Sequence, residues 1–221
     1  MGGFSMDHTY FREFMTYLKK EDKPAAVSYA LSLIENQNVE LEDLYLNVLA
    51  PSLIYFECDE KDEDVCIWKE HFRTSIIRTI LESCYVHVLK LTKNVKKNGV
   101  KVMVLTPAFE YHEIGAIMNT HFMLLEGFDA HYIGANTPKA EILSAIRTYH
   151  PDYVALSVTN PYNIVVTKQT TDEIKRFFPE VGIILGGQAF KDLSHIEHLQ
   201  YDEILNSLED LKAFGKKVSA K

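Results

Sequence analysis

Two side chains with complementary chemistry lie close together in segment 106–115, and together they are suited to holding a metal ion. His112 carries an imidazole, a good ligand for transition metals, and Glu110 lies two residues before it. A carboxylate at this spacing can hold one ring nitrogen and leave the other for the metal. Gly115, three residues further on, would let backbone or a flat ligand approach closely.

The sequence around this segment predicts the elements that position it. The apolar run 102–105 is typical of a buried parallel strand. After the segment, apolar residues recur at helical spacing at Ile114, Ile117, Met118, Phe122 and Leu125. His112 is therefore expected on the loop that leaves the carboxyl end of a strand, which is where open α/β sheets bind ligands.

Two later segments have the same arrangement. Segment 152–159 reads as a strand that ends near Ser157 and Thr159, and segment 183–190 reads as a strand that ends in the pair Gly186 and Gly187. Together with the E-x-H-x-x-G spacing at 110–115, the two segments resemble three motifs of cobalamin-binding domains. These motifs are D-x-H-x-x-G, S-x-T and a glycine pair, and they occur in the same order.

The resemblance assigns a role to each of these residues. It implies that His112 is the lower axial ligand of cobalt, with the cofactor's own base displaced, and that Glu110 supports the imidazole. Ser157 and Thr159 would contact the displaced nucleotide tail, and the pair Gly186 and Gly187 would let the tail pass. Glutamate at position 110 stands where most relatives carry aspartate, and it is common in photoreceptor-type members.

Alternating strands and helices are expected after the polar linker 93–99. Such alternation predicts an α/β fold, a Rossmann-like (flavodoxin-like) parallel sheet with helices on both faces, over residues 99–221. The expected strands are 101–106, 129–134, 152–158, 181–186 and 202–205. The expected helices are 113–126, 138–149, 165–178, 188–198 and 206–217.

The first part of the chain, residues 1–92, is expected to be a bundle of four helices. Helical spacing of apolar residues predicts one helix around Phe11–Leu18, a second from Pro24, a third over 44–54 and a long fourth over 64–91. Pro51 predicts a kink or break in the third helix.

This helical part also resembles a known family. Segments 39–53 and 70–77 are similar to the four-helix cap that precedes the cobalamin domain in B12-dependent photoreceptor regulators and corrinoid methyl carriers. The resemblance implies that Glu70 and His71 face the upper side of the corrin. The tryptophan of the photoreceptor motif W-x9-E-H would fall at position 60, which is glutamate, and Trp68 lies nearby.

Bulk properties exclude several classes of function. The formal net charge of −8 argues against a nucleic-acid-binding surface, and 47% hydrophobic residues suffice for a folded core. No apolar run approaches the ~20 residues of a membrane span, and the first residues lack the pattern of a secretory signal. Cys58, Cys66 and Cys84 lack zinc spacing, so reduced thiols in the cytoplasm are expected.

Three functions are compatible with these observations. The first is a cobalamin-binding sensory or regulatory module that acts through a protein partner or through self-association into a homo-oligomer. The second is a corrinoid carrier, the non-catalytic component of a methyltransferase system. The third is a haem-binding sensor in which His112 would ligate iron. For the first two, the expected cofactor is adenosyl- or methylcobalamin, and no residue of the chain is expected to be catalytic by itself.

Overall fold

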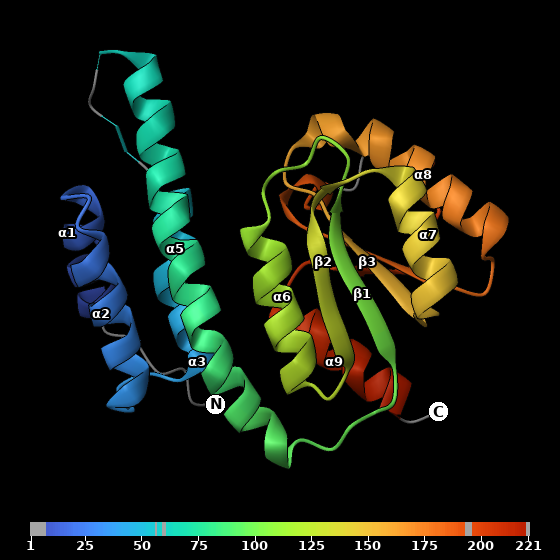
Figure 1. Cartoon of the computed structure of the whole chain (residues 1–221), viewed down its shortest axis with the longest axis horizontal. Helices are drawn as coiled ribbons and strands as arrows, with labels where there is room; N and C mark the ends of the chain where they lie inside the picture. The colour runs from blue at the N-terminus through green and yellow to red at the C-terminus, as the bar shows by residue number, and fades with distance from the viewer. Residues whose placement is uncertain (1–7, 56, 59–60, 193–195, 220–221) are drawn as a thin grey trace. The chain divides into compact units, whose positions relative to one another are not determined.

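The computed structural model describes residues 8–55, 57–58, 61–192 and 196–219. The chain divides into two compact units, Met1–Val86 and His87–Lys221 (Figure 1). The predicted domain division at 1–92 and 99–221 stays a prediction, because compactness alone does not show that each part folds independently. The two units are described separately below.

The first unit is entirely helical over its described residues. Asp22 begins the second helix by accepting a hydrogen bond from the Ala25 N–H at 3.0 Å, and Pro24 occupies the first turn as predicted. Apolar side chains from the different helices fill a common core, among them Phe14, Leu18, Tyr45, Leu49, Ile77 and Leu81, all fully buried. The helices are α1 (His8–Lys19), α2 (Lys23–Glu35), α3 (Leu41–Asp43), η1 (Leu44–Leu49), α4 (Ala50–Ile54) and α5 (Glu63–Leu91), and a short turn η2 (Thr92–Asn94) follows.

The third predicted helix is continuous across Pro51 and is not broken there. Proline lacks an N–H, and in a regular α-helix its ring collides with the carbonyl four residues earlier. Here the turn before the proline widens into a π-helix, η1, and the Ala50 N–H bonds to the Tyr45 carbonyl, five residues back. Such a widened turn is a common way for a helix to absorb an irregular residue.

The prediction of three reduced thiols is wrong for two of the cysteines. Cys58 and Cys66 form a disulfide with their Cα atoms 5.7 Å apart, whereas Cys84 is free and buried. The two bonded cysteines are only eight positions apart, on either side of the start of α5. Proximity in three dimensions decides pairing, and a comparison with zinc-ligand spacings does not detect it.

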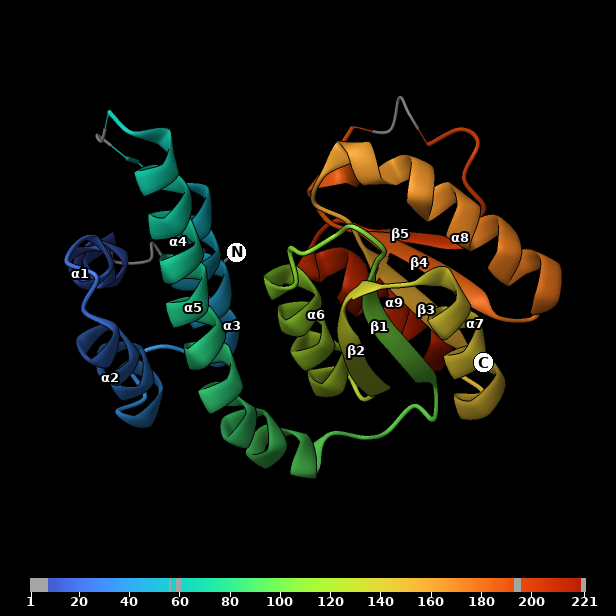
Figure 2. The same ribbon diagram turned by 45° about the horizontal axis from the view of Figure 1, so that its top comes forward.

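The second unit is built on a five-stranded parallel sheet with strand order β2-β1-β3-β4-β5 (Figure 2). The predicted fold class is confirmed, and this order is the flavodoxin-like one. Each strand begins and ends close to its predicted position: β1 (Lys101–Pro107), β2 (Asp129–Thr137), β3 (Tyr153–Ser157), β4 (Gly182–Gly186) and β5 (Glu203–Leu205). The chain reverses direction along the sheet between β1 and β3, so the loops after these two strands diverge at the carboxyl edge.

Helices cover both faces of this sheet. α6 (Ile114–Leu125) and α9 (Leu208–Ser219) lie on one face, and α7 (Lys139–Tyr149) and α8 (Ile164–Phe177) lie on the other (Figure 1). The apolar core under α7 and α8 contains Ile142, Ile146, Ile174 and side chains of β1, β3 and β4. None of the helices in the described parts of the chain is long and apolar enough to cross a membrane.

One predicted helix, 188–198, is wrong over its described residues. The structure has only a short turn there, η4 (Gln188–Phe190), and residues 193–195 lie outside the described part. Gly187 adopts φ 108, which ends the extended strand without starting an α-helix. Phe190 and Ile196 are buried individually in the core, so their apolar spacing reflects anchoring of a loop.

Candidate functional site

The loop between β1 and α6 is held by its own backbone and by a neighbouring loop. The Glu110 N–H bonds to the Pro107 carbonyl at 3.1 Å, and the Glu110 carbonyl accepts from the Thr106 hydroxyl at 2.5 Å and from the Asn136 N–H at 2.9 Å. Asn136 belongs to the end of β2, the strand beside β1. The loop is therefore fixed to the sheet on which it stands.

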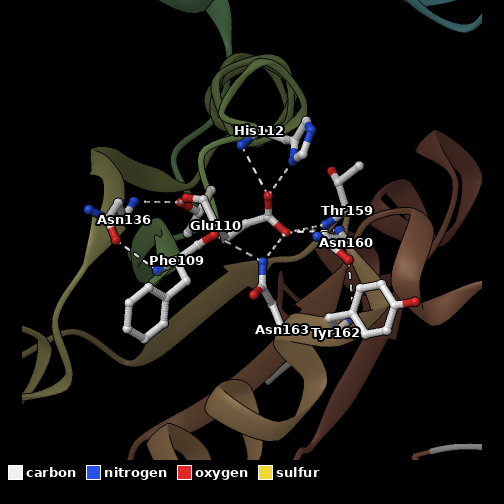
Figure 3. A network of polar contacts seen from close by, with 9 residues as sticks. Phe109, Glu110, His112, Asn136, Thr159, Asn160, Tyr162 and Asn163 are labelled. Carbon is white, nitrogen blue, oxygen red and sulfur yellow. Dashed lines mark hydrogen bonds and ion pairs between the residues drawn. The ribbon is translucent and has the colours of Figure 1, made fainter.

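The Glu110 carboxylate is the centre of the site. It is fully buried, and each of its oxygens has a separate set of donors (Figure 3). Oε1 accepts from the His112 N–H at 3.1 Å and faces His112 Nδ1 at 2.5 Å. Oε2 accepts from the Thr159 N–H at 2.9 Å, the Asn160 N–H at 2.9 Å and the Asn163 amide at 3.1 Å.

These donors determine the charge of Glu110. Burial of the carboxyl raises its pKa, but hydrogen bonds from the Asn160 backbone, the His112 ring and backbone, and the Asn163 amide lower it by more. The net effect is a pKa below the ordinary value, because every donor favours the charged form. Glu110 is therefore ionised at neutral pH although it is buried.

An ionised carboxylate can only accept, and this sets the state of His112. In the neutral ring, the proton is therefore on Nδ1, which faces Glu110, and the lone pair is on Nε2. The His112 side chain is 60% exposed, and its second ring nitrogen lies on the side away from Glu110 (Figure 3). The arrangement therefore presents one oriented imidazole nitrogen to a metal at the carboxyl edge of the sheet.

A cavity opens next to this loop, between the sheet and the helices α6 and α9. It is lined by residues of β1, β3 and β4, by Leu205 at the end of β5, by one face of α6 and by Leu211 of α9. Among the lining residues are Ser157, Gly186, Ala116 and Asn119. Ser157 is mostly buried, and a Cβ placed on Gly115 would lie 3.8 Å from the Ser157 hydroxyl. The structure thus brings Ser157 and Gly186 together at the cavity, and Gly115 lies next to Ser157.

The two glycines of the pair have different surroundings. Gly186 lines the cavity, whereas Gly187 is absent from its lining. A Cβ on Gly187 would lie 2.3 Å from the Val158 carbonyl, and the residue has φ 108. Close packing against β3 therefore explains glycine at position 187. Thr159 contributes to the site through its backbone N–H, which bonds to Glu110.

Glu70 and His71 belong to α5 of the first unit. His71 Nδ1 lies 2.9 Å from a carboxylate oxygen of Glu70. The side chain of His71 is 74% exposed and that of Glu70 is 42% exposed. Trp68 is also exposed, so core packing does not account for it. The predicted role of Glu70 and His71 at the upper face of a corrin stays a prediction.

Sequence reasoning missed the residues that hold Glu110 and its neighbours in place. Asn160 directly precedes the turn η3 (Pro161–Asn163), and Asn163 is its last residue. The side chain of Asn136 accepts a hydrogen bond from the Phe109 N–H at 2.7 Å. The sequence N-P-Y-N at 160–163 carries a signal for a turn, since Asn before Pro favours turn initiation. It carries no signal for the partner of that turn.

Residues 100–204 match the model of the B12 binding domain family. The second unit is therefore a B12-binding domain, as the motif resemblance predicted. In a comparison with curated proteins, none matches the chain significantly.

Solved structures similar to this chain include three corrinoid or cobalamin proteins. The monomethylamine corrinoid protein of Methanosarcina barkeri matches with a TM-score of 0.73 at 14% identity, over 96% of this chain and 99% of that one. A cobalamin-binding protein of Desulfitobacterium hafniense has a TM-score of 0.49 at 15% identity, over 94% and 98%. The methanol:cobalamin methyltransferase complex of Methanosarcina barkeri has a TM-score of 0.47 at 14% identity, over 99% and 82%. The first match shows that the whole chain, including its helical part, has the fold of that corrinoid protein.

The donor set at the carboxyl edge fits the cobalt of a corrin. A metal whose equatorial positions are filled by a macrocycle needs only axial ligands from the protein, and an oriented imidazole is a suitable one. The described residues contain no cluster of three or more His, Cys, Asp or Glu side chains placed to share a metal ion. A small, partly open cavity lies on the same side of the sheet as α6, beside Ser157 and Gly186.

Proposed function

We propose that this protein holds cobalamin in the base-off form, with His112 as the lower ligand of cobalt. The observation that carries the proposal is the fully buried Glu110 carboxylate, which fixes His112 Nδ1 at 2.5 Å and directs the lone pair of Nε2 outwards. The displaced nucleotide tail would enter beside Ser157 and Gly186, where the small cavity has to widen to admit it. Bound in this way, the cofactor would supply a cobalt centre that carries a methyl group for transfer or an adenosyl group whose bond to cobalt can be broken.

The chain contains a control for this proposal. Asp129 and His131 have the same two-residue spacing, with an Oδ1–Nε2 distance of 2.9 Å, and His131 is 53% exposed. Asp129, however, is 55% exposed and begins β2, at the amino edge of the sheet. A carboxylate–histidine pair is therefore not unusual in itself, and a buried, fully bonded carboxylate at the carboxyl edge is what distinguishes His112.

Reconstitution with cobalamin tests the proposal. The wild type, His112→Ala and His131→Ala are loaded with aquo- and methylcobalamin, and their absorbance spectra are recorded. We expect the wild type and His131→Ala to share a spectrum of histidine-ligated, base-off cofactor, and His112→Ala to lose it. The same spectrum in all three proteins would refute His112 as the ligand. Metal analysis of the protein as isolated tests the haem-binding alternative, which requires iron in place of cobalt.

Within this class, we propose that the protein is a corrinoid carrier that passes a methyl group between partner methyltransferases. The fold similarity to the monomethylamine corrinoid protein extends over 96% of this chain, helical part included, and it supports this proposal. The methyl form of the cofactor would then be the working one, and the protein partner would be a methyltransferase.

The exposed pair of Glu70 and His71 favours a second function, a light sensor that binds adenosylcobalamin. Its protein partner would be a regulator, and its signal would pass through that partner or through a change of oligomeric state. Illumination of the adenosylcobalamin-loaded protein separates the two functions. A sensor is expected to change its elution volume when light removes the adenosyl group, whereas a carrier is expected to keep its elution volume. The methylcobalamin-loaded carrier is expected to pass its methyl group to a thiol acceptor only when a partner methyltransferase is added.

A further inference from the structure

Three exposed aromatic residues lie around the site, and the fold alone does not account for them. Tyr111, which is 67% exposed, directly precedes His112, and the other two are Phe109 and Tyr162. Phe109 is 66% exposed and Tyr162 is 88% exposed, in the loops that follow β1 and β3. Both lie on the side of Glu110 away from His112 (Figure 3). Exposed aromatic residues contribute little to folding, so a ring in such a place is more informative than a buried one.

Phe109 has an unfavourable backbone conformation as well as an exposed ring. Its φ is 67, in the left-handed region, where a bulky side chain is rare and costs free energy. Two asparagine side chains hold it there: Asn136 accepts from the Phe109 N–H at 2.7 Å, and Asn163 donates to its carbonyl at 3.2 Å. Backbone strain that the surroundings maintain is concentrated at functional sites.

The rings are fixed relative to the proposed metal ligand. Asn163 donates to Oε2 of Glu110 as well as to the Phe109 carbonyl, and Oε1 of the same carboxylate holds His112. Tyr162 lies within the same turn, and its N–H bonds to Asn160 Oδ1 at 3.1 Å. Phe109, Tyr162 and His112 are therefore positioned by one hydrogen-bond network centred on the Glu110 carboxylate.

We propose that Phe109 and Tyr162 form an apolar support for the corrin macrocycle, and that contact with this ligand is why position 109 carries phenylalanine despite its left-handed backbone. The inference rests on the proposed binding of cobalamin at His112. Contact of an aromatic ring with the periphery of a macrocycle removes apolar surface from water, and loss of either ring is expected to weaken binding by roughly 3- to 10-fold.

The test compares Phe109→Gly, Tyr162→Ala and the control Phe177→Ala, which removes an exposed phenylalanine at the far end of α8. Thermal melts of the cofactor-free proteins are combined with absorbance titrations using aquocobalamin. Phe109→Gly is expected to keep or raise the melting temperature, because glycine tolerates positive φ, while its affinity falls. Tyr162→Ala should lose affinity at an unchanged melting temperature, and Phe177→Ala should match the wild type.

Wild type and His112→Ala are titrated in the same series, so that the two proposals fail separately. If the wild type does not bind, or if His112→Ala gives the wild-type spectrum, the proposed function and this inference both fail. If His112 behaves as proposed and both Phe109→Gly and Tyr162→Ala bind as the wild type does, the aromatic support alone is overturned, and the exposed rings face a protein partner. Should Phe109→Gly fail to fold, the affinity of Tyr162→Ala decides the outcome.

Discussion

The amide of Asn163 donates to Oε2 of Glu110 at 3.1 Å, although 53 positions separate the two residues in the sequence. With the N–H groups of Thr159 and Asn160, it gives that oxygen three donors, all from the loop after β3. The other oxygen faces His112. Glu110 thus connects the two loops that diverge at the carboxyl edge of the sheet, and its substitution tests both at once.

Glu110→Gln is expected to change the tautomer of His112. The glutamine oxygen would take the place of Oε2, because three N–H donors demand an acceptor there, and the NH2 group would then face His112. The ring would accept at Nδ1 and carry its proton on Nε2, where it blocks a metal. We expect cobalamin affinity to fall by ~10–100-fold.

The tautomer can be read without cofactor, from the ¹⁵N shifts of the imidazole in the free protein. Asp129→Asn, beside His131, is the matched control and should leave affinity unchanged. Retention of the Nδ1–H tautomer in Glu110→Gln would contradict the expectation. Glu110→Ala is a poorer test, because it leaves the backbone N–H groups of His112, Thr159 and Asn160 without their acceptor, at about 1–3 kcal/mol each.

Glycine substitutions separate positions needed for the fold from those needed for binding. Gly187→Ala is expected to lower the free energy of unfolding by ~2–4 kcal/mol, because its Cβ would meet the Val158 carbonyl at 2.3 Å and its φ is 108. At Gly115 a Cβ would meet only the Ser157 hydroxyl, at 3.8 Å. Gly115→Ala should therefore keep wild-type stability in urea unfolding, and any loss of cobalamin affinity would report close approach of the ligand. Equal destabilisation by both would argue against this distinction.

His121 is expected to make stability depend on pH. Burial in α6 lowers its pKa to about 4. The unfolded chain binds a proton below a pKa of ~6.5 while the folded chain does not, so this contribution is complete above that pH and decreases on acidification. Between pH 7 and 5 the loss is about 2 kcal/mol, in a window above the titration of most carboxylates.

Urea unfolding at pH 7, 6 and 5 measures this slope. His121→Leu should flatten it, whereas His198→Ala, which removes an exposed histidine, should leave it as in the wild type. A slope that is the same in all three proteins would assign the pH dependence to other groups.

His71→Ala tests the predicted role of the helical unit. If Glu70 and His71 contact the upper face of bound cobalamin, exchange of the upper ligand is expected to accelerate in the variant, with no effect on the spectrum of lower ligation. Stopped-flow exchange of water for cyanide provides the measurement. His87→Ala, further along α5, is the comparison, and equal rates in the wild type and both variants would count against the prediction.

Patterns of apolar residues predicted the sheet and most helices because burial determines them. The run 102–105 is buried in β1, and the spacing from Ile114 to Leu125 gives α6. The same patterns failed at 188–198, where buried Phe190 and Ile196 anchor a loop. Motif spacing placed His112, Glu110 and Ser157 at one edge. It could not supply Asn136, Asn160 or Asn163, because a hydrogen bond between distant loops leaves no periodic signal in the sequence.

The adjacency of β1 and β3 has a consequence for how the protein matures. The bonds to Glu110 close loops of 49 to 53 residues, and such closures cost chain entropy that only the finished sheet offsets. A chain emerging from the ribosome completes β1 and α6 well before β3, and in that interval Glu110 lacks the donors from the loop after β3 that fix its carboxylate beside His112. Cofactor loading is therefore expected to follow completion of the sheet. A synthetic peptide with the sequence of residues 101–125 should accordingly bind no cobalamin.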